Sequence, residues 1–257
     1  MSLERLIGIF ATILGLIMGS AMTALSWRVP REESWVHGRS RCPGCGHELG
    51  ALDLVPVLSW LFSRGRCRHC GNRVSARYPF IELLCGAWGY LAFRHTGLVP
   101  AYAFVALWGF LIVALLWIDL DFQLLPDALT LPGTLFAIAA AVLNHSLRDA
   151  MFGMLVGAGL LFLVAELYLR IRKVEGMGFG DVKLAAMFGA LLGPSLALLT
   201  IFMAAFAGSV VGGVLMARGR GGMKTALPFG VFLAPAAMIA YLWGAGWVSA
   251  YVGLLRH

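Results

Sequence analysis

The chain has 257 residues, of which 60% are hydrophobic and only 13% are charged. A typical soluble domain is roughly 45–50% apolar and about 25% charged, so this chain has too few polar residues to cover a globule in water. The formal net charge of +7 does not indicate nucleic-acid binding, because the basic residues gather in loops between apolar segments. The composition therefore excludes a soluble domain and predicts an integral membrane protein that binds no nucleic acid.

Apolar segments follow one another along the chain at lengths suited to membrane helices. A helix needs about 20 predominantly apolar residues to cross the hydrocarbon core. We expect eight spans, at residues 3–27, 79–93, 101–118, 129–143, 151–169, 182–192, 195–217 and 229–254. The sixth is short for a full crossing, and the C-terminus changes side if that segment does not cross. The expected fold class is an all-α polytopic membrane protein.

The basic residues set the expected orientation. Sixteen of the twenty lie within residues 28–77, 170–183 and 218–224, which leaves Arg5, Arg94, Arg148 and Arg256 for the opposite side. Cytoplasmic loops of membrane proteins carry the excess of Lys and Arg. We therefore expect these three segments in the cytosol, with the N-terminus and the C-terminus outside.

The longest polar segment, residues 28–78, contains two CxxC pairs, Cys42 with Cys45 and Cys67 with Cys70, separated by 21 residues. The gap is near zinc-ribbon spacing, and four thiolates suit a tetrahedral Zn²⁺ that supplies folding energy to a short segment. Two disulfides are the alternative, but a cytosolic location keeps thiols reduced. Because no coordination position is left open, we expect a structural zinc site in a small cytosolic zinc-ribbon-like domain between the first and second membrane helices.

Acidic residues near the expected cytosolic ends of the spans give the clearest sign of chemistry. Asp119, Asp121 and Asp127 lie where the third span ends, and Asp181 closes the sequence Gly178-Phe-Gly180-Asp181 just before the sixth. Ionisable groups at membrane depth are expensive and indicate function. Interfacial carboxylates that contact headgroups or basic loops are the alternative, and that alternative fits Asp121 and Asp127 better than Asp181.

Asp119 and Asp181 fall at the same expected face, so they can meet although they lie far apart in the sequence. The glycines before Asp181 leave room for an extended substrate backbone, and no strand precedes them, as a nucleotide-binding glycine loop would require. Two carboxyl groups that share a site do not both ionise readily. One can activate water while its protonated partner polarises a carbonyl. The residues thus predict an aspartyl protease, although they do not separate Asp119 from Asp121.

The basic segment at residues 28–78 also contains acidic side chains that could bind a basic peptide, namely Glu32, Glu33, Glu48 and Asp53. Glu82, near the cytosolic end of the second span, is a further candidate. Pairing of Glu82 with Arg77 or a neighbouring arginine is the favoured interpretation.

The sequence resembles the type IV prepilin peptidases (prepilin leader peptidase/N-methyltransferases) over nearly the whole chain. The specific stretches are Ser40-Arg-Cys-Pro-Gly-Cys45, Asp53-Leu-Val-Pro-Val-Leu-Ser-Trp60, Arg64-Gly-Arg-Cys67, Arg77-Tyr-Pro-Phe-Ile-Glu-Leu-Leu84, Ile118-Asp119, Leu125-Pro126-Asp127 and the GxGD box that ends at Asp181. Together they are far more specific than any single motif.

This resemblance implies that Asp119, which stands seven residues before Pro126, and Asp181 are the catalytic pair, with Asp127 in support. It maps the family's zinc ligands onto Cys42, Cys45, Cys67 and Cys70. It implies that a short basic leader is removed from type IV prepilins or type II secretion pseudopilins at the cytosolic face of the bacterial inner membrane. It also implies N-methylation of the new N-terminus by S-adenosylmethionine, at a site that the residues themselves do not indicate.

The chain is therefore expected to comprise a first transmembrane helix (1–27), a cytosolic four-cysteine zinc-binding domain (28–78) and a GxGD aspartyl protease transmembrane domain (79–257). A membrane transporter is one alternative, but it would place its carboxylates near the bilayer midplane in repeated halves. A zinc-ribbon scaffold of a secretion system would leave the turn before Asp181 without a purpose. A presenilin-like or signal-peptide-peptidase-like protease would lack the cysteine domain.

Overall fold

The computed structural model describes residues 2–34, 38–144, 146–174, 176–219 and 227–255. The basic residues Arg220, Lys224 and Arg256, which contribute to the expected orientation, lie outside this part of the chain. The described residues form helices and turns, with two isolated β-bridges in the cysteine-rich segment. The all-α fold class is therefore confirmed.

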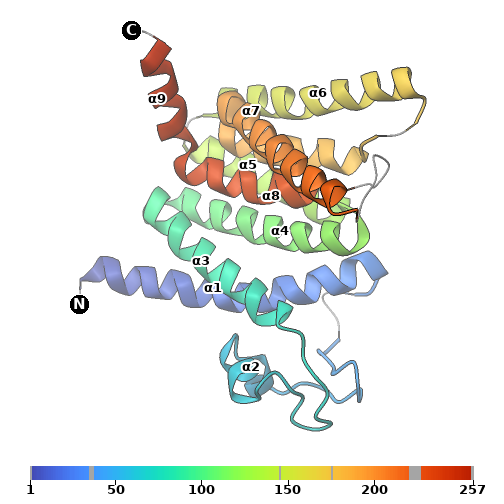
Figure 1. Ribbon diagram of the computed structural model, residues 1–257. Helices are drawn as coiled ribbons and strands as arrows, with labels where there is room; N and C mark the ends of the chain where they lie inside the picture. Colours follow the sequence, from blue (N-terminus) through green and yellow to red (C-terminus); the bar gives the residue numbers. More distant parts are fainter. Residues whose placement is uncertain (1, 35–37, 145, 175, 220–226, 256–257) are drawn as a thin grey trace.

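In the part of the chain that the structure describes, seven long helical segments make up the membrane part (Figure 1). They are α1 (Leu3–Arg28), α3 (Arg77–Thr96), α4 (Pro100–Phe122), α5 (Asp127–Leu143), α6 (Leu147–Arg172), α7 (Phe179–Ala217) and α8 (Gly230–Ile239), which continues through one π-helical turn (Ala240–Gly244) into α9 (Ala245–Leu255). Between α1 and α3 the described residues form only short helical turns, η1 (Val29–Arg31), η2 (Ala51–Leu54) and α2 (Leu58–Phe62).

Five of the described helices are long and apolar enough to cross a membrane: Leu3–Arg31, Pro100–Phe122, Leu147–Arg172, Phe179–Ala217 and Gly230–Leu255. α5 is a shorter apolar helix. Each of the eight expected spans coincides with a helical segment, so the multi-pass architecture is confirmed, whereas the count of eight stays a prediction.

α7 bends sharply where a turn was expected between the sixth and seventh spans. Gly193 has φ 74° and ψ 176°, and Pro194 follows it. Proline lacks the N–H that a continuous helix needs at this point. The first arm, residues 179–192, is about 21 Å long at 1.5 Å per residue, which is less than the roughly 30 Å of a hydrocarbon core. In Figure 1 the chain runs to the left, reverses at the bend and returns to the right.

The helix ends gather at two sides of the bundle. Figure 1 shows the C-terminal ends of α1, α4, α6 and α7 and the N-terminal ends of α5, α7 and α8 on the right. The α3–α4 and α5–α6 connections and the bend of α7 lie on the left, with the N-terminus. This alternation agrees with the expected order of sides.

α4 lies at the centre of the bundle, and two thirds of its most apolar stretch is buried. Its side chains Trp108, Ile112, Leu115 and Ile118 are fully buried, and they pack in one core with residues of α3, α7 and α8. Because α4 is central, a carboxyl group in its last turn is removed from solvent. The central position of α4 therefore places Asp119 in a buried environment.

Candidate functional site

Asp119 lies in the last turn of α4 with only 4% of its surface exposed. Its Oδ2 atom accepts a hydrogen bond from the backbone N–H of Val231, in the first turn of α8, at 3.0 Å. A Cβ atom on Gly230 would stand 2.7 Å from this Oδ2, so only glycine lets α8 begin against the carboxyl group. The amide groups at a helix N-terminus stabilise a carboxylate that faces them.

Asp181 lies in the first turn of α7 and is also buried, at 8% exposure. Its Oδ1 atom is shielded from solvent and has no hydrogen-bond partner among the described residues. Asp181 is close enough to Asp119 for their carboxyl groups to interact electrostatically, and the N–H of Gly230 interacts with both. The structure thus brings the two aspartates together at the N-terminus of α8.

Asp121 and Asp127 have different surroundings. Asp121 forms an ion pair with Arg77, and the Arg77 guanidinium lies 4.8 Å from the centre of the Trp117 ring. Asp127 forms an ion pair with Lys183 at 2.6 Å. Among the described residues, neither Asp119 nor Asp181 has a basic partner. The two pairs of acids therefore separate into a buried pair and an ion-paired surface pair.

Leu125 forms an apolar wall beside the buried pair. A Cβ on Gly180 would stand 2.9 Å from the Leu125 Cβ, and one on Gly230 would stand 3.2 Å from its Cδ1. Sequence reasoning missed the contribution of Gly230 and Val231. A glycine inside an apolar span carries no distinctive signal, and the nearest available sign was the sequence Pro228-Phe229-Gly230, where α8 begins.

The four cysteines of residues 28–78, a segment that we call the cysteine lobe, converge. Their Sγ atoms all lie within 4.8 Å of one another, and those of Cys42 and Cys70 are 3.8 Å apart. A tetrahedral zinc with Zn–S bonds of about 2.3 Å requires sulfur atoms about 3.8 Å apart. All five cysteines of the chain are free thiols, so the two-disulfide alternative is not supported. The residues present fit a tetrahedral metal ion.

The two CxxC pairs have the same backbone geometry. The N–H of Gly46 donates to the Cys42 carbonyl at 2.8 Å, and that of Gly71 donates to the Cys67 carbonyl at 3.0 Å. Both glycines have positive φ, 71° and 72°, which other residues rarely adopt. Backbone N–H groups of Cys70 and His69 lower the pKa of the Cys67 thiol to about 6. Because metals bind the thiolate form, this turn favours coordination.

Glu82 does not pair with Arg77, and that expectation is wrong. Its Oε2 atom accepts a hydrogen bond from the backbone N–H of Val57 in the cysteine lobe at 2.8 Å. Glu82 lies on the face of α3 that packs against α1, since a Cβ on Gly19 would stand 2.6 Å from the Glu82 Cα. Arg77 instead contacts Asp121 on α4. The carboxyl group of Glu82 therefore joins the lobe to the bundle.

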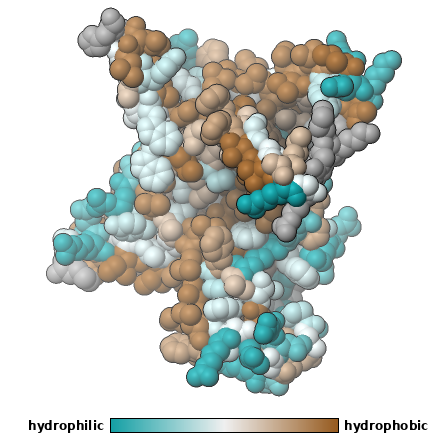
Figure 2. Space-filling view, viewed as in Figure 1, coloured by the Kyte–Doolittle hydropathy of each residue, from teal (hydrophilic) through white to brown (hydrophobic). Residues whose placement is uncertain are grey.

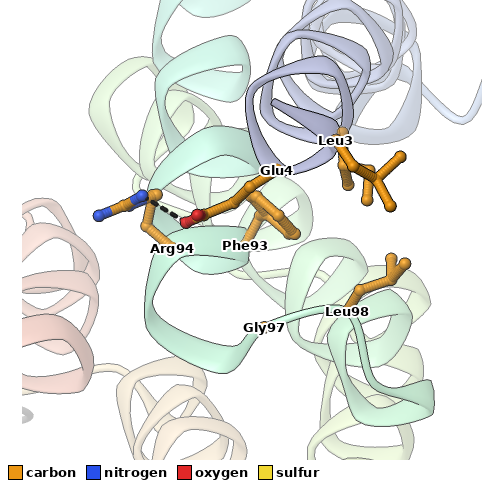
Figure 3. Close-up of a pocket in the computed structure, with 7 residues that line it drawn as sticks. Leu3, Glu4, Phe93, Arg94, Gly97 and Leu98 are labelled. Atoms are coloured by element: carbon orange, nitrogen blue, oxygen red, sulfur yellow. Dashed lines mark hydrogen bonds and ion pairs between the residues drawn. The ribbon is translucent and has the colours of Figure 1, made fainter. Parts of the chain in front are cut away.

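A cavity of about 480 Å³ lies at the opposite end of the bundle (Figure 3). It lies between the start of α1 and the end of α3, where Arg94 pairs with Glu4 at 2.6 Å. Figure 3 shows mainly apolar side chains around this ion pair. Because the cavity contains neither aspartate of the buried pair, it is not the candidate site.

Fold and site together define a multi-pass membrane protein with a buried pair of aspartates and a four-cysteine lobe. A model of the bacterial peptidase A24 N-terminal domain matches residues 13–96, and a model of the type IV leader peptidase family matches residues 103–213. The chain belongs to the type IV leader peptidase family. Membership makes it a peptidase of the inner membrane, so the transporter and scaffold alternatives are not supported.

Curated relatives cover most of the chain. A protein of Stutzerimonas stutzeri is 36% identical over 96% of this chain and 94% of its own length. One of Pseudomonas aeruginosa is 35% identical over 90% of this chain and 89% of its own length. One of Aeromonas hydrophila is 41% identical over 80% of this chain and 72% of its own length. All three are named prepilin leader peptidase/N-methyltransferase. No solved structure matches the chain.

Proposed function

We propose that this chain removes the basic leader from type IV prepilins or type II secretion pseudopilins, with Asp119 and Asp181 as the catalytic pair. The observation that carries the proposal is the buried Oδ1 atom of Asp181, which has no partner among the described residues although it lies beside Asp119. A buried polar atom without a hydrogen bond is costly. Water or a substrate carbonyl at this position would satisfy it.

The reaction needs one proton shared between the two carboxyl groups. One carboxylate takes a proton from water, and the water oxygen bonds to the scissile carbonyl carbon while the protonated partner donates to the carbonyl oxygen. The resulting tetrahedral intermediate collapses when the carboxyl group that took the water proton gives it to the amide nitrogen and the C–N bond breaks. One hydroxyl of the intermediate returns its proton to the other carboxylate, which restores the starting state of the pair. The Val231 N–H holds Asp119 at a fixed position throughout, which keeps the pair preorganised.

Substrate orientation follows from the side of the bundle on which the pair lies. Thirteen of the basic residues belong to residues 28–77 and 170–183, which adjoin the same helix ends as Asp119 and Asp181 (Figure 1). The excess of Lys and Arg supports a cytosolic location for this side. The scissile bond would therefore lie at the cytosolic edge of the membrane, where a leader precedes an apolar pilin helix.

Four acidic residues of the cysteine lobe were candidates for binding a basic leader, and two of them have no ion pair among the described residues. Arg39 and Arg41 pair with Glu48, and Arg68 pairs with Asp53. Glu32 and Glu33 form no ion pair among the described residues, and both are exposed just beyond η1 at the aspartate side of the bundle. We assign leader binding to this acidic pair.

We further propose that Cys42, Cys45, Cys67 and Cys70 hold a structural Zn²⁺, supported by the sulfur spacing. When bound, zinc would crosslink the two CxxC turns. N-methylation of the new N-terminus by S-adenosylmethionine is proposed from the names of the relatives.

The test is cleavage of a purified prepilin by the full chain in detergent, with labelled S-adenosylmethionine present. Asp119→Asn and Asp181→Asn should each lower the cleavage rate on the order of 10³-fold. Asp121→Asn should cleave, and Glu166→Gln, which changes a surface ion pair within α6, should match wild type. Wild-type rates in either buried-site variant would refute the aspartyl mechanism. Cleavage without label on the mature N-terminus would refute the proposed N-methylation and leave the proposed peptidase activity standing.

A further inference from the structure

The cysteine lobe exposes large apolar side chains between its two CxxC pairs. Leu52 and Phe62 are 71% and 79% exposed. Other exposed members of this apolar face, which extends over η2, α2 and the turn between them, are Leu54, Val55, Leu58 and Leu61. Exposed apolar side chains gathered on a polar lobe mark a surface that contacts another molecule or a membrane.

A basic cavity of about 470 Å³ adjoins this apolar face. Arg64, Arg66 and Arg73 line it together with the ring of Trp60. The indole Nε1 donates to the Val74 carbonyl at 3.0 Å, so the ring is fixed as one wall.

The three arginines of this cavity differ from the other arginines of the lobe in their partners. In the described part of the chain they form no ion pair, in contrast to the arginines elsewhere in the lobe that bind Glu48 and Asp53. Three arginines that line one cavity favour an anionic ligand, and phosphate is a ligand that guanidinium groups bind well. S-adenosylmethionine is a net cation at neutral pH, and a basic leader is also positive, so this cavity suits neither.

The apolar face is continuous with the lipid-facing surface of the bundle. The chain leaves the lobe into α3, whose Tyr78, Phe80 and Leu83 are exposed. Figure 2 shows the apolar surface of the bundle continuing onto the left edge of the lower lobe, where Figure 1 places α2. The hydrogen bond from Val57 to Glu82 holds this edge against α3. A bilayer that surrounds α3 therefore reaches the lobe.

We infer that residues 51–66, together with Arg73, form a membrane-surface anchor whose arginines bind anionic phospholipid. Leu58, Leu61, Phe62 and their apolar neighbours enter the boundary between headgroups and acyl chains, and Arg64, Arg66 and Arg73 contact headgroup phosphate in the same leaflet. A segment with an apolar side and a basic side binds a membrane surface through both. An aromatic ring such as Trp60 is well suited to the interface.

The anchor can be tested on the full chain in lipid nanodiscs by hydrogen exchange of residues 51–74. Nanodiscs of phosphatidylcholine alone are compared with nanodiscs that also contain phosphatidylglycerol. Phosphatidylglycerol should slow exchange in this segment several-fold in the wild type. The triple variant Arg64→Gln, Arg66→Gln and Arg73→Gln should lose most of that protection, because each arginine near an anionic surface contributes roughly fivefold to the bound population.

The matched control is the triple variant Arg39→Gln, Arg41→Gln and Arg68→Gln, which removes the same charge from the paired arginines of the lobe and should keep the protection. Equal loss in both triple variants would show a general charge effect and overturn the site. Equal exchange of the wild type in the two lipids would overturn lipid binding. The same protection by inorganic phosphate, by S-adenosylmethionine or by a pilin peptide, in detergent without phosphatidylglycerol, would assign the cavity to that ligand instead.

Discussion

The aspartate pair and the cysteine lobe are built in opposite ways. Asp119 and Asp181 come from two helices far apart in sequence, and they meet at the N-terminus of a third helix, where the helix ends gather at one side of the bundle. The four cysteines come from two short turns with the same local hydrogen bonds, and the surrounding residues bury little. Packing therefore positions the first site, whereas local turns and a metal position the second, so damage to one should leave the other intact.

The largest expected effect is the removal of zinc, because metal binding is worth about 10–16 kcal/mol in small zinc domains. Chelation, or Cys42→Ser, should release the metal and unfold the cysteine lobe while the helices of the bundle stay protected from hydrogen exchange. Cys85→Ala changes the fifth cysteine, which is buried in α3, and should retain zinc. Metal content and exchange of residues 40–74 are the measurements. Unfolding of α4 and α7 together with the lobe would contradict the separation of the two regions.

A change at the helix that holds the aspartates should have the next largest effect. In Gly230→Ala the new Cβ would stand 2.7 Å from Asp119 Oδ2, so the carboxyl group or α8 must shift. A displacement near 1 Å costs on the order of 100-fold in rate. We expect kcat for prepilin cleavage to fall by about that factor, with zinc content unchanged.

Gly246→Ala provides the matched control, since a Cβ at Gly246 meets nothing within 4 Å. That variant should cleave at the wild-type rate. If Gly230→Ala were equally active, Asp119 would not depend on the N-terminus of α8, and the packing account of this site would fail.

Loss of the hydrogen bond that joins the cysteine lobe to the helix bundle should have a smaller effect on stability. Glu82 accepts a hydrogen bond from the backbone N–H of Val57. Val57 has φ 62° and ψ −50°, a backbone conformation that a β-branched residue rarely adopts. Glu82→Ala leaves the Val57 N–H without its partner, at a cost of about 1–3 kcal/mol. Exchange of residues 53–62 should accelerate accordingly. Glu82→Gln keeps a hydrogen-bond acceptor, so its exchange rate should lie between those of the wild type and Glu82→Ala. If both variants exchange at the wild-type rate, Glu82 does not hold the lobe against the bundle.

The two regions also differ in how far the sequence predicts them. The CxxC spacing predicted the convergence of the cysteines, because each turn is local. The meeting of Asp119 with Asp181 was predicted from their shared side of the membrane and from the family resemblance. The contribution of Gly230 was not predicted, since it depends on how α8 packs. The pairing of Glu82 was predicted wrongly, because the sequence does not say which face of α3 meets α1 and which meets α4.

The smallest expected effect concerns the ion pair between Asp127 and Lys183, which decides whether the surface acids take part in the chemistry. The two side chains are 55% and 34% exposed, and exposed ion pairs contribute about 0–1 kcal/mol. Asp127→Asn and Lys183→Gln should therefore change prepilin cleavage by less than about fivefold, and the double variant should resemble either single one. A loss in Asp127→Asn comparable with that in Asp119→Asn, while Lys183→Gln remains active, would mean that Asp127 acts on the substrate. The site would then extend from the buried pair to the surface acids, and the division between them would have to be withdrawn.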